Sequence, residues 1–167
     1  MAITTEQIKA LRDLTGAGVM DSKKALEESN GDIEKAEQIL KAKGIEKIAG
    51  KSDRETSEGL IHSYVHSGSR IGSLVEINCE TDFVSRTPEF AELAHNLAMQ
   101  IAAMAPEYVD KSEIGEDEKR SAEEICLLQQ PFIRDNALTI QDIVTEVAAK
   151  VGENIRVKRF ARFTLGE

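Results

Sequence analysis

Few residues in this chain have the types and spacing that catalysis or metal binding requires, and each candidate set lacks a residue that such a site needs. His62 and His66 are four residues apart. On a strand, where we expect them, this is not a metal-binding spacing, and no glutamate follows His62. Cys79 and Cys126 are far apart in sequence, form no metal motif and have no neighbouring histidine to activate a thiolate. We therefore expect no catalytic residues, no metal site and no cofactor, and a protein that acts by binding.

The residue best placed to bind a partner is Phe83. It lies between Asp82 and Val84, where the chain leaves a hydrophobic, strand-like run, and a helix start at Thr87-Pro88 follows. An aromatic side chain at such a turn is typical of an anchor that enters a partner's pocket. On local sequence alone, however, the commoner outcome is that a phenylalanine folds back into its own core.

The elements before residue 45 are expected to be three short helices. Thr4 and Gln7 have the spacing of a capping box, and Asp32 is expected to cap the third helix, which we expect to end at Gly44. Apolar residues at helical spacing indicate the buried face of each helix: Ile8, Leu11 and Leu14 in the first, Met20, Ala25 and Leu26 in the second, and Ile33, Ala36, Ile39 and Leu40 in the third.

The remainder of the chain predicts an α+β fold. Residues 46–58 are polar and charged and are the best candidate for a linker. Turn residues and alternating apolar residues then predict a three-stranded antiparallel sheet packed by helices on one face. We therefore expect a helical domain over residues 1–45, a linker over 46–58 and an α+β core over 59–167. The expected core elements are strands at 59–66, 70–79 and 155–165 and amphipathic helices that start at Thr87-Pro88 and at Thr139.

Composition argues against several classes of function. The net charge of −9 disfavours a general nucleic-acid binder, which needs a basic face to neutralise phosphates. No apolar run approaches the ~20 residues of a membrane span, and the first residues lack the pattern of a secretory signal. We expect a cytoplasmic protein with reduced cysteines, no membrane association and no direct contact with nucleic acid.

Two motifs carry a resemblance to a known family. The first is Thr15-Gly16-Ala17-Gly18 with the residues that follow it, and the second is Thr81-Asp82-Phe83-Val84. Together they closely resemble bacterial elongation factor Ts, the family of guanine-nucleotide exchange factors for the translational GTPase elongation factor Tu. The resemblance spans nearly the whole chain, with further matches at residues 61–66, 131–133, 152–155 and 159–163.

The resemblance implies both a fold and a mechanism. The N-terminal domain would resemble ubiquitin-associated domains and dock on the GTPase domain of elongation factor Tu. Phe83 would then enter an apolar cleft of the GTPase and displace the elements that hold Mg²⁺ and the β-phosphate, so that GDP leaves and GTP can rebind. The residues that match partner-binding positions are Arg12, Val19, Met20 and Lys23 in the first motif region, Thr81, Asp82, Phe83 and Val84 in the second, and His66.

The chain also departs from the family pattern. Many members have Met at position 19 and Cys at position 22, where this chain has Val19 and Ser22, with no evident cost. A longer helical insertion of the family is shortened between Val109 and Ala122. The core occurs once, where longer members have two repeats, and this implies a homodimer that covers an edge strand. Cys126 lies where a subunit contact could form, although a reduced cytosol disfavours an intersubunit disulfide there.

Other interpretations remain open at this point. The helical domain suits an adaptor that binds ubiquitin-like partners, which predicts sensitivity to changes at Met20 and indifference to changes at Phe83. Met20 is also compatible with core packing, and Arg12 and Lys23 with solvated helix charges. The basic residues of the last strand are either an ordinary charged face or an RNA-facing patch, which the net charge disfavours: Arg156, Lys158, Arg159 and Arg162.

Overall fold

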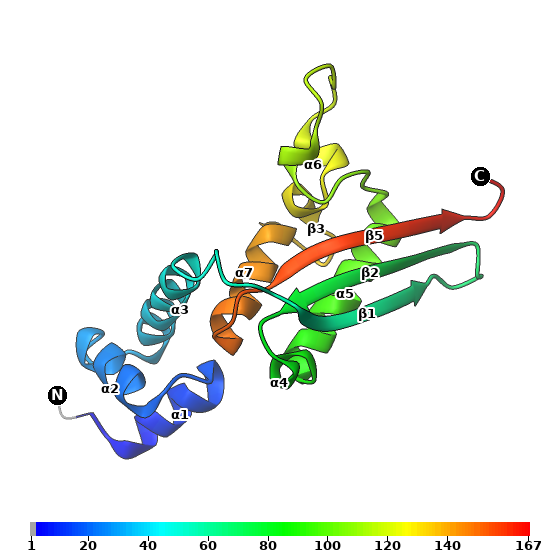
Figure 1. The fold of residues 1–167 in the computed structure, drawn as a ribbon. Coiled ribbons are helices and arrows are strands. Elements are labelled where there is room, and N and C mark those ends of the chain that lie inside the picture. The colour runs from blue at the N-terminus through cyan, green and yellow to red at the C-terminus, as the bar shows by residue number, and fades with distance from the viewer. Residues whose placement is uncertain (1–2) are drawn as a thin grey trace. The chain divides into compact units, whose positions relative to one another are not determined.

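The computed structural model describes residues 3–167, which separate into two compact units (Figure 1). The first unit comprises the residues up to Asp53 together with Ala148–Glu153. The second comprises Arg54–Val147 and Asn154–Glu167. This division places the last turn of one helix, α7 (Ile140–Val151), in the first unit and the rest of that helix in the second.

The first unit contains three helices whose ends are fixed by local hydrogen bonds. They are α1 (Thr5–Thr15), α2 (Val19–Glu28) and α3 (Ile33–Ala49). The predicted capping box is present, because the Thr4 hydroxyl accepts from the Gln7 N–H at 3.2 Å while the Gln7 side chain accepts from the Thr4 N–H at 2.9 Å. Asp32 caps α3 as predicted by accepting from the Lys35 N–H at 3.1 Å, and this bond lowers the pKa of Asp32.

The prediction that α3 ends at Gly44 is wrong. The helix continues to Ala49, so it takes residues 46–49 from the segment that was expected to be a linker. A Cβ atom at Gly44 would lie 3.1 Å from the Cβ of Ala149, within the first unit. Gly44 is therefore a close-packing residue inside a helix rather than a helix stop.

The core of the first unit differs from the predicted faces at two side chains. Leu11, Ala25, Leu26 and Ala36 are fully buried there, but Leu14 is 60% exposed and Met20 63% exposed. Steps of three residues, as in Ile8, Leu11 and Leu14, drift around a helix that has 3.6 residues per turn. Leu14 has therefore left the buried stripe.

The second unit is built on the predicted three-stranded antiparallel sheet. Its strands lie in the order β1 (Glu58–Val65), β2 (Ile71–Cys79) and β5 (Arg156–Thr164). The register pairs His62 with Val75 and Val75 with Phe160 on one face, and Ser63 with Leu74 and Leu74 with Ala161 on the other. The α+β fold class is confirmed.

Helix α5 (Pro88–Met104) packs against β1 and β2 on the first of these faces (Figure 1). Thr87 caps the helix and Pro88 begins it, as predicted. Its buried stripe includes Phe90, Leu93, Leu97 and Ile101, and Val75 and Ile77 are buried on the face of the sheet that the helix covers. The outer face of β1, β2 and β5 instead carries exposed apolar residues: Ile61, Val65, Leu74 and Phe163.

Short elements complete the second unit. They are α4 (Asp82–Ser85), η1 (Lys111–Glu113), α6 (Ala122–Ile125), η2 (Leu127–Gln129) and a hairpin of β3 (Pro131–Phe132) and β4 (Asp135–Thr139). The β3–β4 hairpin was not predicted, because strands this short do not show an alternating pattern. Both cysteines are buried and reduced, so Cys126 is not exposed for a bond to another subunit.

Candidate partner-binding site

The side chain of Phe83 projects from α4 into solvent. It is 82% exposed, more than any other large apolar side chain in the described part of the chain. The next residue, Val84, is buried, because adjacent residues on a helix point about 100° apart. The expected exposure of Phe83 is confirmed, although the residue lies on a short helix rather than in a turn.

Side-chain hydrogen bonds hold the backbone of α4 at both ends. Upstream, the Cys79 thiol donates to the carbonyl of Thr81 at 3.1 Å. Within the helix, the Ser85 hydroxyl donates to the carbonyl of Asp82 at 2.8 Å. Downstream, the Thr87 hydroxyl donates to the carbonyl of Val84 at 2.8 Å. Phe83 is therefore presented on a supported backbone rather than on a free loop.

Asp82 forms an ion pair that sequence reasoning missed. Its Oδ2 lies 3.0 Å from Nη2 of Arg86, and both side chains remain substantially exposed. Residues four apart are neighbours on a helix, so the spacing was available in the sequence. Arg86 lies just after α4, which has only four residues, so no helical pattern in the sequence indicated this pair. The acidic neighbour of Phe83 is thus partly neutralised while it stays accessible to a partner.

His66 lies away from this surface. It follows β1 at the turn of the β1–β2 hairpin, whereas α4 follows the other end of β2, where Glu58 pairs with Cys79. At ~3.3 Å per residue, the two ends of the hairpin are separated by roughly 25 Å. The phenol of Tyr64 and Nδ1 of His66 are within hydrogen-bond distance at 3.0 Å. The structure therefore does not bring His66 together with residues 81–84.

The rings of His66 and His95 lie beside that of Tyr64, and the ring of His62 lies beside that of His95. Nε2 of His62 lies 3.3 Å from Nδ1 of His95, a residue that the sequence did not single out. Burial, and then the charge of His95, lower the pKa of His62. Among residues 3–167, no group of three or more His, Cys, Asp or Glu side chains could hold a metal ion.

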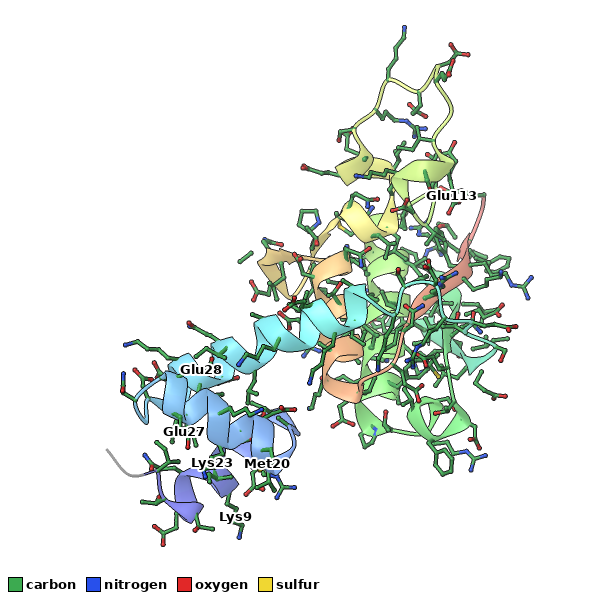
Figure 2. The ribbon with its side chains drawn as sticks, turned by 60° about the vertical axis from the view of Figure 1, so that its left-hand side comes forward. Lys9, Met20, Lys23, Glu27, Glu28 and Glu113 are labelled. Carbon is green, nitrogen blue, oxygen red and sulfur yellow. The ribbon has the colours of Figure 1, made fainter. Side chains whose placement is uncertain are left out.

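The predicted docking residues of the helical unit lie around the loop between α1 and α2. Val19 and Met20 are exposed apolar residues at the start of α2. Nε of Arg12 donates to the carbonyl of Ala17 in this loop at 3.3 Å, and Lys23 pairs with Glu27 at 3.8 Å. Figure 2 shows Met20, Lys23 and Glu27 in succession along α2. The surface is thus apolar at its centre with basic side chains beside it.

Two further surfaces bear on the predictions, one at Leu14 and one on the basic strand β5. Leu14, expected in the core, instead adds an exposed apolar side chain at the end of α1. Nε of Arg162 donates to the carbonyl of Ala102 at 3.1 Å, and Nε of Arg159 donates to Oε2 of Glu76 at 2.7 Å. These contacts favour a charged strand face over an RNA-facing patch.

Within the described residues, no helix is long and apolar enough to cross a membrane.

Comparison with known proteins assigns the whole chain to one type of protein. The family model of elongation factor Ts matches residues 3–123 and 117–167. The elongation factor Ts proteins of Carboxydothermus hydrogenoformans and Coprothermobacter proteolyticus are each 46% identical to the chain, over 99% and 100% of its length and 90% and 100% of their own. That of Thermotoga neapolitana is 46% identical over 100% of the chain and 99% of its own length. The first alignment runs over 195 residues, more than the 167 of this chain, so the relatives carry residues that have no counterpart here.

Proposed function

This chain belongs to the elongation factor Ts family, and we propose that it acts on elongation factor Tu through Phe83. It is a guanine-nucleotide exchange factor of translation elongation, which promotes the release of GDP from elongation factor Tu so that GTP can rebind. The observation that supports Phe83 as the acting residue is its 82% exposure on a short helix whose backbone is held at both ends.

The proposed mechanism is a transfer of binding energy. Burying a phenylalanine side chain in a partner's cleft stabilises a complex by about 1.5–3 kcal/mol, which corresponds to a change of roughly ten- to a hundredfold in an equilibrium constant. Mg²⁺ and backbone amides around a phosphate are strong local charges and dipoles, so displacing them weakens the GTPase's hold on GDP. By reciprocity, bound GDP lowers the affinity of elongation factor Tu for the exchange factor to the same extent.

We assign docking to the helical unit and the wedge to the α+β unit. Val19 and Met20 supply apolar contact area, and Arg12 and Lys23 supply charge beside it. Thr81, Asp82 and Val84 frame Phe83 in the second unit. Since no bond is made or broken in this mechanism, the protein is not an enzyme and requires no cofactor of its own. As a translation factor it acts in the cytoplasm.

The outer face of the sheet fits a homodimer. Antiparallel neighbours point to the same side, so the pairing of Val65 with Gly72 and of Gly72 with Phe163 places both apolar side chains on one exposed face. The same face carries Glu76 hydrogen-bonded to Arg159, so it offers both signs of charge to a second copy of itself. A two-fold dimer in which both copies use this same patch covers the face. The sequence had instead suggested a dimer that covers an edge strand.

The role is tested by the release of fluorescent GDP from elongation factor Tu over a range of chain concentrations. We expect saturable acceleration, with Met20→Ala raising the concentration that gives half of the effect and Phe83→Ala lowering the maximal rate. No acceleration by the unaltered chain would overturn the exchange role. Binding to a ubiquitin-like protein that is lost in Met20→Ala and kept in Phe83→Ala would favour the adaptor instead.

A further inference from the structure

The segment that carries Phe83 begins next to a mostly buried carboxylate. Glu80 follows Cys79 at the end of β2 and precedes Thr81, the N-cap of α4. Only 15% of its side chain is exposed. A carboxylate withdrawn from water to this extent needs donors that satisfy its oxygens. The donors around Glu80 therefore show which segments it holds together.

Each oxygen of Glu80 accepts a hydrogen bond from a different part of the second unit. Oε1 accepts from the backbone N–H of Asn154 at 2.7 Å, and Oε2 accepts from Nη1 of Arg54 at 3.1 Å. Asn154, itself buried, donates from Nδ2 to the backbone carbonyl of Arg54 at 3.2 Å. The end of β2, the first residue of the second unit and the connection from α7 to β5 thus meet at one carboxylate.

We propose that Glu80, Asn154 and Arg54 are positioning residues for exchange, which fix the direction in which Phe83 points. The inference rests on the proposed role of Phe83. A side chain that is 82% exposed receives little support from its own packing, so its position depends on the backbone beneath it. The Thr87 hydroxyl holds the far end of α4. The network of Glu80 holds the near end, together with the Cys79 thiol.

Loss of this support lowers the rate of exchange without abolishing docking. An anchor on a mobile segment must be ordered at the moment of binding, and ordering even one backbone residue corresponds to roughly a tenfold change in an equilibrium constant. Preorganisation by surrounding hydrogen bonds removes this cost. Glu80 and its donors belong to the second unit, whereas the docking residues lie in α1 and α2 of the first unit, so Glu80→Ala leaves the docking residues unaltered. The maximal release rate is therefore the quantity that the network controls.

The test compares Glu80→Ala with Glu107→Ala, because Glu107 is also a carboxylate paired with an arginine, Arg120, but on a loop far along the chain. Two quantities are measured: GDP release from elongation factor Tu at saturating protein, and amide hydrogen exchange of the full chain. We expect Glu80→Ala to lower the saturated rate roughly tenfold and to speed amide exchange at residues 81–86, while the strands keep their protection. Glu107→Ala leaves both quantities unchanged.

Several results would overturn the proposal. An unchanged saturated rate in Glu80→Ala would do so, and so would faster amide exchange spread over the whole sheet, which indicates general destabilisation. If Phe83→Ala has no effect on GDP release, the proposed role of Phe83 is refuted independently of Glu80. Unchanged amide exchange at 81–86 in Glu80→Ala would in that case still refute the positioning role of Glu80. Should Glu80→Ala not fold, Arg54→Ala removes only the more exposed donor and is expected to lower the rate about two- to fivefold. An unaltered rate in Arg54→Ala would contradict the proposal.

Discussion

At the scale of single residues, Ser22 carries a cost that its sequence context did not reveal. Its hydroxyl is buried in α2 and has no hydrogen-bond partner in the described part of the structure. A buried polar group without a partner destabilises a fold by about 1–3 kcal/mol. The departure from the cysteine found in many family members, for which we expected no cost, is thus unfavourable for the helical unit.

We predict that Ser22→Ala raises the free energy of unfolding of the helical unit by about 1 kcal/mol. The measurement is the protection of α2 amides against hydrogen exchange. Ser29→Ala is the matched control, because Ser29 is also buried but its hydroxyl donates to the carbonyl of Leu26 at 3.2 Å. That change should lower protection. If Ser22→Ala also lowers it, the Ser22 hydroxyl has a partner that the structure does not show.

Phe83 illustrates what a sequence can and cannot establish about a residue. The local pattern left two outcomes open, an anchor or a core residue, because exposure depends on what covers a position in three dimensions. The resemblance to the family favoured exposure, and the structure confirms it. The sequence did not indicate the contacts made by Arg86, by His95 and by the donors to Glu80. Each of these contacts depends on a local geometry or on segments that are far apart in the chain.

At the scale of elements, the contact between β1 and α5 brings His62 close to His95, and His62 should make the stability of the fold depend on pH. Burial, and then the charge of His95, lower the pKa of His62 in the folded chain. In the unfolded chain His62 binds a proton at about pH 6.5. Between the two pKa values the unfolded state binds more protons, so stability falls as the pH falls below about 6.5.

We predict that the urea midpoint of the α+β unit decreases between pH 7.5 and pH 5.5, and that His62→Gln reduces this decrease. His66→Gln, at the exposed hairpin turn, is the control for the loss of a histidine side chain. Carboxylates whose pKa values are lowered by arginine donors, such as Glu76 and Glu118, titrate below this window. A pH dependence that is the same in His62→Gln and in the unaltered chain would contradict the assignment.

The long elements were predictable and the short ones were not. Strands β1, β2 and β5 and helices α5 and α7 show clear periods in the sequence, and each lies within a few residues of its predicted place. Gly44 was mistaken for a helix stop because only its neighbour Ala149, more than a hundred residues later, shows why a glycine is needed there. The β3–β4 hairpin was missed because two-residue and five-residue strands carry too little pattern.

Ion pairs connect the two ends of the segment of the core that we expected to be shortened. Arg120 donates to Glu107 through Nη2 at 2.9 Å and to Glu118 through Nε at 3.0 Å. The donors on Arg120 lower the pKa of Glu118 to about 2. Glu107 and Arg120 therefore join the two ends of the segment in which we expected a shortened insertion. We expect the chain to fold and to promote exchange without that insertion.

At the scale of the whole molecule, we predict that the chain forms the proposed dimer and that Phe163→Asp makes it a monomer. Phe163 is 66% exposed on the outer face of the sheet, and a charge placed there would be buried without a partner in the pair. The measurement is the molar mass by light scattering over a range of concentrations. Leu165→Asp, beyond the end of β5, is the milder variant for comparison. A monomeric unaltered chain would rule out the sheet face as a dimer interface.

The most direct test of the account is the rate of GDP release from elongation factor Tu at saturating concentrations of the Phe83→Ala chain. Met104→Ala is the matched control, because Met104 is also an exposed apolar side chain of the second unit but lies at the end of α5. We predict that Phe83→Ala lowers the saturated rate by roughly ten- to a hundredfold while amide exchange stays native, and that Met104→Ala matches the unaltered chain. A saturated rate that Phe83→Ala leaves unchanged would contradict the central claim that Phe83 is the side chain that drives exchange.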